Sequence, residues 1–298
     1  MPASANKLAS LATSPFKGEK AFSGLPPRSP PRARYKALMR IATYNVNGIG
    51  ARLPRLLEWL EETQTDIVCL QELKAPDERF PAAEINALGY NAVWHGQKSW
   101  NGVAILARGL DIELRRKGLP GDPDESHSRY IEADVGGLIV GGLYLPNGNP
   151  VPGPKFDYKL AWFEALLAHA RTLFETERPV VLAGDWNVIP TDSTDDVFSA
   201  KRMAADALMQ PESRACFARL KHAGWTDAVR AIHPKGPVYT FWDYTMNAWA
   251  RDAGFRIDHL MLSPPAADRL VDAGVDKDHR GREKASDHAP TWIKIRQN

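Results

Sequence analysis

The stretch VVLAGDWNVIP (residues 180–190) joins an apolar, β-branched run to a polar end. The run has the composition of a buried strand, and Asp185 and Asn187 follow where that strand should stop. Three more stretches share this order of apolar and then polar residues: IATYNVNGIG (41–50), DIVCLQEL (66–73) and LYLPNGN (143–149). Two stretches reverse the order: RIDHLML (256–262) and SDHAPTW (286–292). These six stretches govern both the fold and the site that we expect.

Outward from these stretches, strand-like and helix-like segments alternate along the chain after Met39. Nine runs predict strands: 40–46, 66–72, 90–95, 102–108, 130–135, 138–145, 179–186, 256–263 and 289–295. Three segments predict helices: 54–63, 158–175 and 213–224. Several of the strands follow each other through short turns with no helix between them, which argues against a purely parallel sheet. We therefore expect an α/β fold in which two mixed β-sheets pack face to face and are flanked by helices.

The composition is that of an ordinary globular protein, with 44% hydrophobic and 25% charged residues. No apolar run approaches the roughly 20 residues that a transmembrane helix needs, and the N-terminal region lacks the apolar segment of a secretory signal. The two cysteines, Cys69 and Cys216, favour a reducing compartment over an oxidising one. We expect a cytoplasmic protein with no membrane partner.

The first 38 residues are basic and rich in proline and serine. They hold seven lysines and arginines against one acid, Glu19, so this segment carries +6 and the remaining residues carry −4. Residues 1–38 are expected to be a disordered basic tail, or sequence upstream of a start at Met39; an organelle transit peptide is the alternative. The folded domain is expected at residues 39–298. A polyanionic partner would have to meet a local basic patch or metal ions on that domain.

Polar side chains end four of the predicted strands and begin two others. Since the end of one strand lies beside the start of its antiparallel neighbour, all of them can meet at one edge of the two sheets. Each could instead be a turn residue, and for Asn47 and Asn147 alone that is the simpler interpretation. Carboxylates that abut a buried strand are costly unless something pairs with them. The acids in this position are Glu72, Asp185, Asp258 and Asp287.

A hard divalent cation is a suitable partner for these acids. Mg²⁺ prefers carboxylate and amide oxygens and completes its shell with water and substrate phosphate. Zinc is a poorer candidate, because the chain has no Cys/His ligand spacing. Acids, amides, one histidine and one tyrosine together favour phosphoryl-transfer chemistry at a magnesium site, where Mn²⁺ is the expected substitute.

Taken together, these residues resemble the exonuclease III class of apurinic/apyrimidinic endonucleases, bacterial type, within the endonuclease/exonuclease/phosphatase superfamily. The matching stretches run in order through residues 39–298: IATYNVNGI, DIVCLQELK, WNGVAIL, YLPNGN, KFDYKLAW, VLAGDWNVIP, GWTDAVR, YTFWDY, FRIDHLMLS and SDHAPTWI. The resemblance implies a four-layer, DNase I-like α/β sandwich. It also implies a Mg²⁺-dependent, nucleoid-associated nuclease that acts on duplex DNA with abasic sites or damaged 3′ ends. A monomer is expected, because nothing in the sequence suggests an obligate dimer. The implied activities are 3′→5′ exonuclease, abasic-site endonuclease and 3′-end cleaning.

The resemblance further implies roles for the metal-binding and water-activating residues. Glu72 looks like the main Mg²⁺ ligand, helped by Asn45 and Asp287. Asp185 resembles the group that orients or deprotonates the attacking water, and Asn187 the group that holds that water or the phosphate. The full set expected at the metal is Asn45, Glu72, Asp185, Asn187, Asp287 and His288.

Three more residues resemble catalytic groups of that class. His288 resembles the residue that contacts the scissile phosphate, and Asp258 the carboxylate that fixes the imidazole tautomer and raises its pKa. Tyr144 resembles the phenol that binds the phosphate or assists the leaving group.

The expected DNA-binding residues fall into two groups. One walls a pocket for a flipped-out baseless sugar, although ordinary core packing is an equal alternative for its first member: Phe241, Phe255 and Ile257. The other contacts the DNA backbone: Lys155, Tyr158, Lys159, Trp242 and Arg251. A solvated helix start is the alternative for the two lysines.

This chain departs from the pattern of the class at a few positions. Asn47 stands where some relatives have a metal-binding aspartate, which puts a second metal ion in question. Pro150 and Thr245 stand where eukaryotic relatives carry bulky residues that wedge into DNA.

Two other functions stay open at this stage. The same fold could hydrolyse a lipid or inositol phosphate, or the chain could be a catalytically dead DNA-binding protein. Cleavage of DNA that is lost on substitution of Asp185 would support the nuclease and exclude both alternatives.

Overall fold

The structure, a computed structural model, describes residues 38–297. The tail expected at residues 1–38 lies outside these residues, apart from Leu38, which already belongs to the first strand. Within the described part of the chain, every helix is too short or too polar to cross a membrane.

Strands and helices alternate along the described residues, with short connections between most of them. Their order is β1 (Leu38–Asn45), α1 (Ile49–Thr63), β2 (Ile67–Gln71), η1 (Asp77–Arg79), α2 (Ala82–Ala87), β3 (Tyr90–His95), β4 (Val103–Arg108), β5 (Ile112–Lys117), β6 (Tyr130–Val135), β7 (Leu138–Tyr144), α3 (Pro154–Phe174), β8 (Val180–Asp185), α4 (Ala200–Met203), α5 (Pro211–His222), β9 (Thr226–Asp227), α6 (Ala228–Ile232), β10 (Asp258–Leu262), α7 (Pro264–Ala267), β11 (Leu270–Val275), α8 (Lys277–Arg280) and β12 (Thr291–Arg296).

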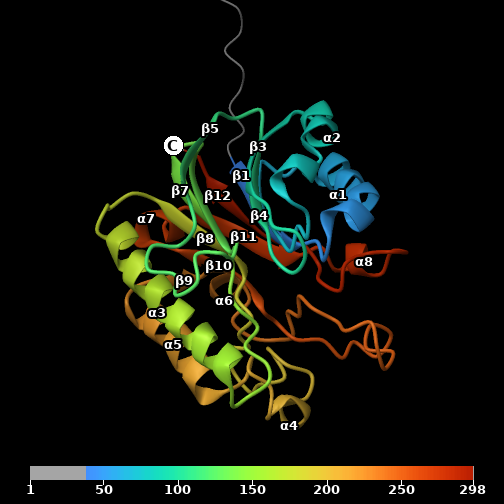
Figure 1. Cartoon of the computed structure of the whole chain (residues 1–298), viewed down its shortest axis with the longest axis vertical. Helices are drawn as coiled ribbons and strands as arrows, with labels where there is room; N and C mark the ends of the chain where they lie inside the picture. The colour runs from blue at the N-terminus through green and yellow to red at the C-terminus, as the bar shows by residue number, and fades with distance from the viewer. Residues whose placement is uncertain (1–37, 298) are drawn as a thin grey trace, which may run out of the picture. The chain divides into compact units, whose positions relative to one another are not determined.

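The strands form two six-stranded sheets (Figure 1). One sheet has the order β11-β12-β1-β2-β4-β3, and the other has the order β5-β6-β7-β8-β10-β9. Strand β1 is parallel to β2 and β7 is parallel to β8, whereas the other neighbouring strands are antiparallel. Both sheets are therefore mixed, as the short turns between predicted strands indicate.

The two sheets pack face to face, and helices cover the outer face of each. Aliphatic side chains from both sheets, such as Ile41 and Val181, form the central core. Trp59 and Leu60 of α1 pack on the outer face of the first sheet, and Trp162 of α3 packs with α5 on the outer face of the second. Figure 1 shows these two helical layers on opposite sides of the sheets. The expected four-layer sandwich is confirmed.

All nine predicted strands are present, and the structure adds three. Strand β5 escapes prediction because it is a largely exposed edge strand with four charged residues in six. Strand β9 has only two residues, and β11 contains an irregular register between Leu270 and Asp272. The three predicted helices are present as α1, α3 and α5; α1 begins at Ile49, five residues before its predicted start. The other α-helices have four to six residues and the 3-10 helix η1 has three, too few to show a helical period.

Candidate active site

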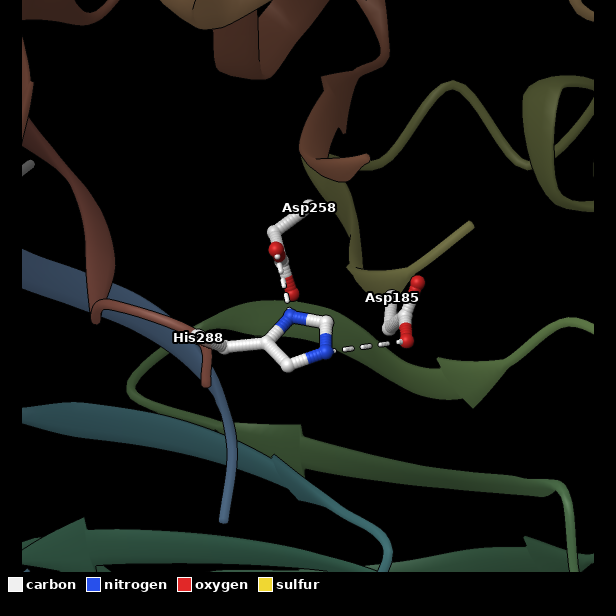
Figure 2. A group of neighbouring side chains, drawn as sticks. All are labelled: Asp185, Asp258 and His288. Atoms are coloured by element: carbon white, nitrogen blue, oxygen red, sulfur yellow. Dashed lines mark hydrogen bonds and ion pairs between the residues drawn. The ribbon is translucent and has the colours of Figure 1, made fainter. Parts of the chain in front are cut away.

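Asp185 and Asp258 face each other across two neighbouring strands. Asp185 ends β8, Asp258 begins β10, and the antiparallel register pairs them directly. His288 precedes β12 of the other sheet, and its imidazole lies between the two carboxylates (Figure 2). His288 Nδ1 is 2.9 Å from Asp258 Oδ2, and His288 Nε2 is 3.8 Å from Asp185 Oδ2. Three side chains that are distant in sequence thus form one buried cluster, as the sequence predicts.

Glu72 joins this cluster from the turn after β2. Asn45, at the end of β1, donates from Nδ2 to Glu72 Oε1 and to Asp185 Oδ2, both at 3.0 Å. Tyr144, at the end of β7, donates its hydroxyl to Glu72 Oε1 at 2.8 Å. The parallel register of β7 and β8 places Tyr144 opposite Asp185. Strand ends from both sheets therefore meet in one site.

Asp287 is connected to Glu72 through the side chains of Asn47 and Lys74. Asn47 Nδ2 donates to Asp287 Oδ1 at 3.1 Å, and Lys74 Nζ donates to Asn47 Oδ1 at 2.6 Å. Lys74 Nζ also lies 2.8 Å from Glu72 Oε2. The lysine therefore links Glu72 to the Asn47–Asp287 pair.

Asn187 lies just beyond β8 and is held by hydrogen bonds on all sides. Its backbone N–H donates to Asp185 Oδ1 at 2.9 Å, and its Nδ2 donates to the Leu145 carbonyl at 2.8 Å. Asn147 Nδ2 donates to Asn187 Oδ1 at 3.2 Å. Lys159 Nζ donates to the backbone carbonyls of Asn147 and Asn187. The loops after β7 and β8 are thus tied together beside Asp185.

Burial and charge shift the pKa values of the two central groups. Burial disfavours a charged imidazole, but the Asp258 carboxylate and its hydrogen bond outweigh that cost and raise the pKa of His288 to about 10. Burial, with repulsion from Asp258, raises the pKa of Asp185 to about 7 despite attraction by His288. A cationic imidazole suits binding of a phosphate, and a carboxyl group that titrates near neutral pH suits proton transfer from water.

The donor atoms of the site fit a hard divalent cation. Asp185, Asp258 and His288 bring ligand atoms within 4.8 Å of one another. Asp258 Oδ1 is buried and has no hydrogen-bond partner among the described residues. Asn45 turns its nitrogen toward the acids while its oxygen accepts from the Asn47 N–H at 3.0 Å, so binding of a cation by that oxygen requires the amide to turn over. Mg²⁺ and Mn²⁺ prefer carboxylate oxygens as ligands, and this site offers several of them.

An aromatic wall borders the cluster at His288. The Phe241 ring meets the His288 ring edge to face at 4.9 Å and stacks obliquely on Phe255 at 4.6 Å. Ile257 packs in the same apolar cluster and is almost fully buried. These three residues lie together beside the site, where a pocket wall is expected.

The residues expected to contact the DNA backbone do not all reach the surface. Lys155 and Tyr158 line the open cleft in front of Glu72 and Asp287, which has a volume of about 670 Å³. Lys159 is completely buried, and Trp242 is 1% exposed with its Nε1 donating to an aspartate within the protein. The expectation that these two side chains touch DNA is wrong, because loops that the sequence does not reveal fold over them. Arg251 is exposed, but it lines a different cavity.

Sequence reasoning missed two basic residues of the site. Lys74 comes directly after DIVCLQEL and looks like a solvated cation until the turn at Glu72 folds it back. Arg129 stacks its guanidinium over the Tyr144 ring at 4.9 Å and donates to the Tyr144 carbonyl at 3.2 Å. It precedes β6 and lies in no motif singled out from the sequence. Only pairing of β6 with β7 brings it to Tyr144.

A four-layer α/β sandwich with acids, amides and one imidazole at the edge of both sheets defines a class of hydrolases of phosphate esters. The model of the Endonuclease/Exonuclease/phosphatase family matches residues 42–288, and the chain belongs to this family.

Relatives with known names resemble nearly the whole described chain. Exodeoxyribonuclease III of Haemophilus influenzae is 32% identical over 268 residues, which cover 87% of this chain and all of the relative. An AP endonuclease from Archaeoglobus fulgidus superimposes with a TM-score of 0.81 at 35% identity, covering 86% of this chain and 98% of that structure. The 3′ phosphatase NExo from Neisseria, bound to product DNA hairpin, superimposes with a TM-score of 0.81 at 38% identity, covering 86% and 99%.

Proposed function

We propose that this protein is a Mg²⁺-dependent DNA-repair nuclease that hydrolyses phosphodiester bonds at abasic sites and at 3′ ends of duplex DNA. The observation that carries the proposal is the convergence of Glu72, Asp185 and the Asp258–His288 pair in one cluster, which adjoins the open cleft that Glu72 lines. Similarity to exodeoxyribonuclease III, an AP endonuclease and a 3′ phosphatase supports DNA as the substrate.

Each residue of the cluster has a part in this proposal. Asp185, with a pKa near neutrality, accepts a proton from the attacking water, and Asn187 holds that water or the phosphate. The His288 imidazolium, kept charged by Asp258, binds a non-bridging oxygen of the scissile phosphate. Tyr144 supports the departing 3′ oxygen through its hydroxyl.

The metal is proposed to bind at the acidic side of the cleft. Glu72, Asp185 and Asp287 would hold Mg²⁺, with Asn45 and Asn187 as amide ligands. His288, although expected at the metal from the sequence, would lie beside this set, because a charged imidazole has no lone pair to give to a cation. When bound, Mg²⁺ neutralises charge that develops on the phosphate and the leaving group. Mn²⁺, with the same preference for oxygen, is proposed to substitute.

Residues 39–298 are proposed to be the catalytic domain and to act as a cytoplasmic monomer. Every group of the cluster comes from one chain, so a second copy adds nothing that the chemistry needs. Light scattering on the purified protein tests the monomer, and a chain that starts at Met39 tests whether residues 1–38 contribute to activity.

The direct test uses duplexes with one abasic site, one nick or one 3′-phosphate, with and without Mg²⁺. We expect incision or end cleaning with Mg²⁺ only, and no product from Asp185→Ala. Asp268→Ala, which removes an exposed acid that lies outside the cluster, is the matched control and should retain activity. Absence of cleavage by the unaltered protein, or phosphate release from an inositol phosphate instead, would sink the proposal. DNA binding that EDTA does not affect, without turnover, would point to a dead DNA-binding protein.

A further inference from the structure

A second cavity, of about 330 Å³, lies beyond the aromatic wall that borders His288. One side comes from residues 197–203, which include α4, and the other from the loop 243–255. A bridge between Val197 and Phe255 joins the two sides. Phe255 lines this cavity, stacks on Phe241, and through Phe241 reaches His288. Two aromatic rings therefore separate the cavity from the proposed phosphate-binding imidazole.

Large apolar side chains stand exposed in this cavity. Phe198 is 45% exposed and Met246 is 65% exposed, although most side chains of their kind are buried in this protein. Removal of a large apolar side chain from water is favourable. Two such side chains that stay exposed on opposite sides of one cavity are therefore typical of a surface that binds a partner. The surface suits a flat, apolar ligand.

Two guanidinium groups flank these apolar side chains. The Arg251 guanidinium lies 5.9 Å from the centre of the Phe198 ring, and Arg202 Nη2 lies 3.6 Å from Met246 Sδ. Among residues 38–297, neither arginine has a carboxylate within ion-pair distance, in contrast to Arg219 or Arg230. The nearby Asp243 carboxylate accepts from the Thr245 N–H at 2.7 Å. Within the described residues, the lining of the cavity therefore holds two guanidinium groups without an ion pair and one carboxylate, Asp243, so positive charge is in excess.

We propose that this cavity binds an unstacked base of the DNA strand being cut, with the flanking phosphates on Arg202 and Arg251. An aromatic ring gives a stacking platform for any base, and guanidinium groups pair with phosphates. The inference rests on the proposed nuclease function and extends it, because it assigns a second contact on the substrate next to the cleavage position. A base held there fixes the register of the strand and keeps the neighbouring phosphate at His288.

The position of the base can be mapped with the full-length protein by cross-linking. A set of duplexes carries one 5-iodouracil at successive positions around an abasic site, and each is irradiated with the protein in EDTA. We expect one or two adjacent positions to cross-link to Phe198 or Met246, identified by mass spectrometry. Cross-links confined to other residues at every position would overturn the assignment.

Binding measurements on variants give an independent outcome. Phe198→Ala should weaken binding of the abasic duplex about tenfold, whereas Phe198→Trp should bind nearly as the unaltered protein does. Arg251→Gln should lower the slope of log Kd against log salt by about one. Leu114→Ala is the matched control, since Leu114 is 43% exposed on the edge strand β5.

The two proposals fail in distinguishable ways. If the unaltered protein cleaves abasic duplex but Phe198→Ala and Leu114→Ala bind it equally, the base site is wrong and the nuclease stands. If the unaltered protein does not cleave DNA at all, the nuclease itself is wrong. Melting temperatures of the variants should match that of the unaltered protein, because the substituted side chains are exposed.

Discussion

Asp258 accepts a hydrogen bond from His288 Nδ1 at 2.9 Å, and both side chains are buried. The carboxylate keeps the imidazole charged up to a pKa of about 10, whereas burial alone would push that pKa below its usual 6.5. In Asp258→Asn the imidazole should therefore be neutral at pH 8. We expect kcat to fall about 30- to 100-fold at pH 8 and by much less near pH 5.5.

The pH profile of kcat for Asp258→Asn checks this prediction. The sign follows from the protonated imidazole being the active form: its contribution to kcat is present below the pKa of His288 and lost above it. Protonation of Asp185 separately lowers kcat below about pH 7, so the two proteins are compared with each other at each pH. A loss of kcat that is equal at pH 5.5 and pH 8 would mean that Asp258 acts only by holding the fold.

Removal of the Glu72 carboxylate should weaken metal binding more than it weakens the fold. Glu72→Gln keeps the size of the side chain and an oxygen that can accept from Asn45 and Tyr144, but it loses the negative charge. We expect the Kd for Mg²⁺ or Mn²⁺, measured by calorimetry without DNA, to rise at least about tenfold. Glu84→Gln, an exposed substitution on α2, should leave that Kd unchanged. Equal Kd values for both variants would remove Glu72 from the metal site.

Lys159 should give the protein a pH-dependent stability. Burial lowers its pKa to about 7, although attraction by Asp185 opposes this, while the unfolded chain keeps the ordinary value of 10.5. Above pH 7 the unfolded state therefore binds more protons than the folded state, and stability rises with pH until about 10.5.

The free energy of unfolding of the unaltered protein should thus increase relative to Lys159→Met by up to about 1 kcal/mol per pH unit between pH 7 and 9. Chemical denaturation at several pH values measures this difference. Lys155→Met, whose side chain is exposed in the same helix α3, should show no such trend. A constant difference across this pH range would mean that Lys159 stays charged in the folded protein.

Gly184 leaves no room for a side chain directly before Asp185. A Cβ at this position would lie 1.9 Å from the Leu143 carbonyl oxygen of the neighbouring strand. Gly142, one strand away, is the matched control, because a Cβ there would meet nothing closer than 3.4 Å. Gly184→Ala should therefore destabilise the protein by several kcal/mol, on the order of 3, and Gly142→Ala by less than about 1. Thermal unfolding checks both; similar melting temperatures would show that β8 can move away from β7.

The sequence predicts the site residues that lie at the ends of strands. Asp185 and Asp258 adjoin clear apolar runs, so strand pairing alone brings them together. His288 precedes another such run, and its meeting with both acids needs only the packing of two sheets. Strand periodicity and the cost of a buried carboxylate are local properties, and they can be identified without the fold.

The sequence does not predict which side chains are buried by loops that fold over them. Lys159 looks like the exposed first turn of a helix, yet the loops after β7 and β8 close over it. Trp242 looks like a surface aromatic, yet α8 and the loop around Asp252 cover it. Their burial depends on long-range contacts that no local pattern encodes.

The strand ends that supply the candidate site are spread from Asn45 to His288 along the chain. A ribosome must therefore release nearly all of these residues before Asp258 and His288 can join Asp185. Partly made chains, and proteolytic fragments that lack β12 and the turn before it, carry no complete set of groups. A protein built this way cannot damage the genome it is proposed to maintain until its chain has been made as far as His288.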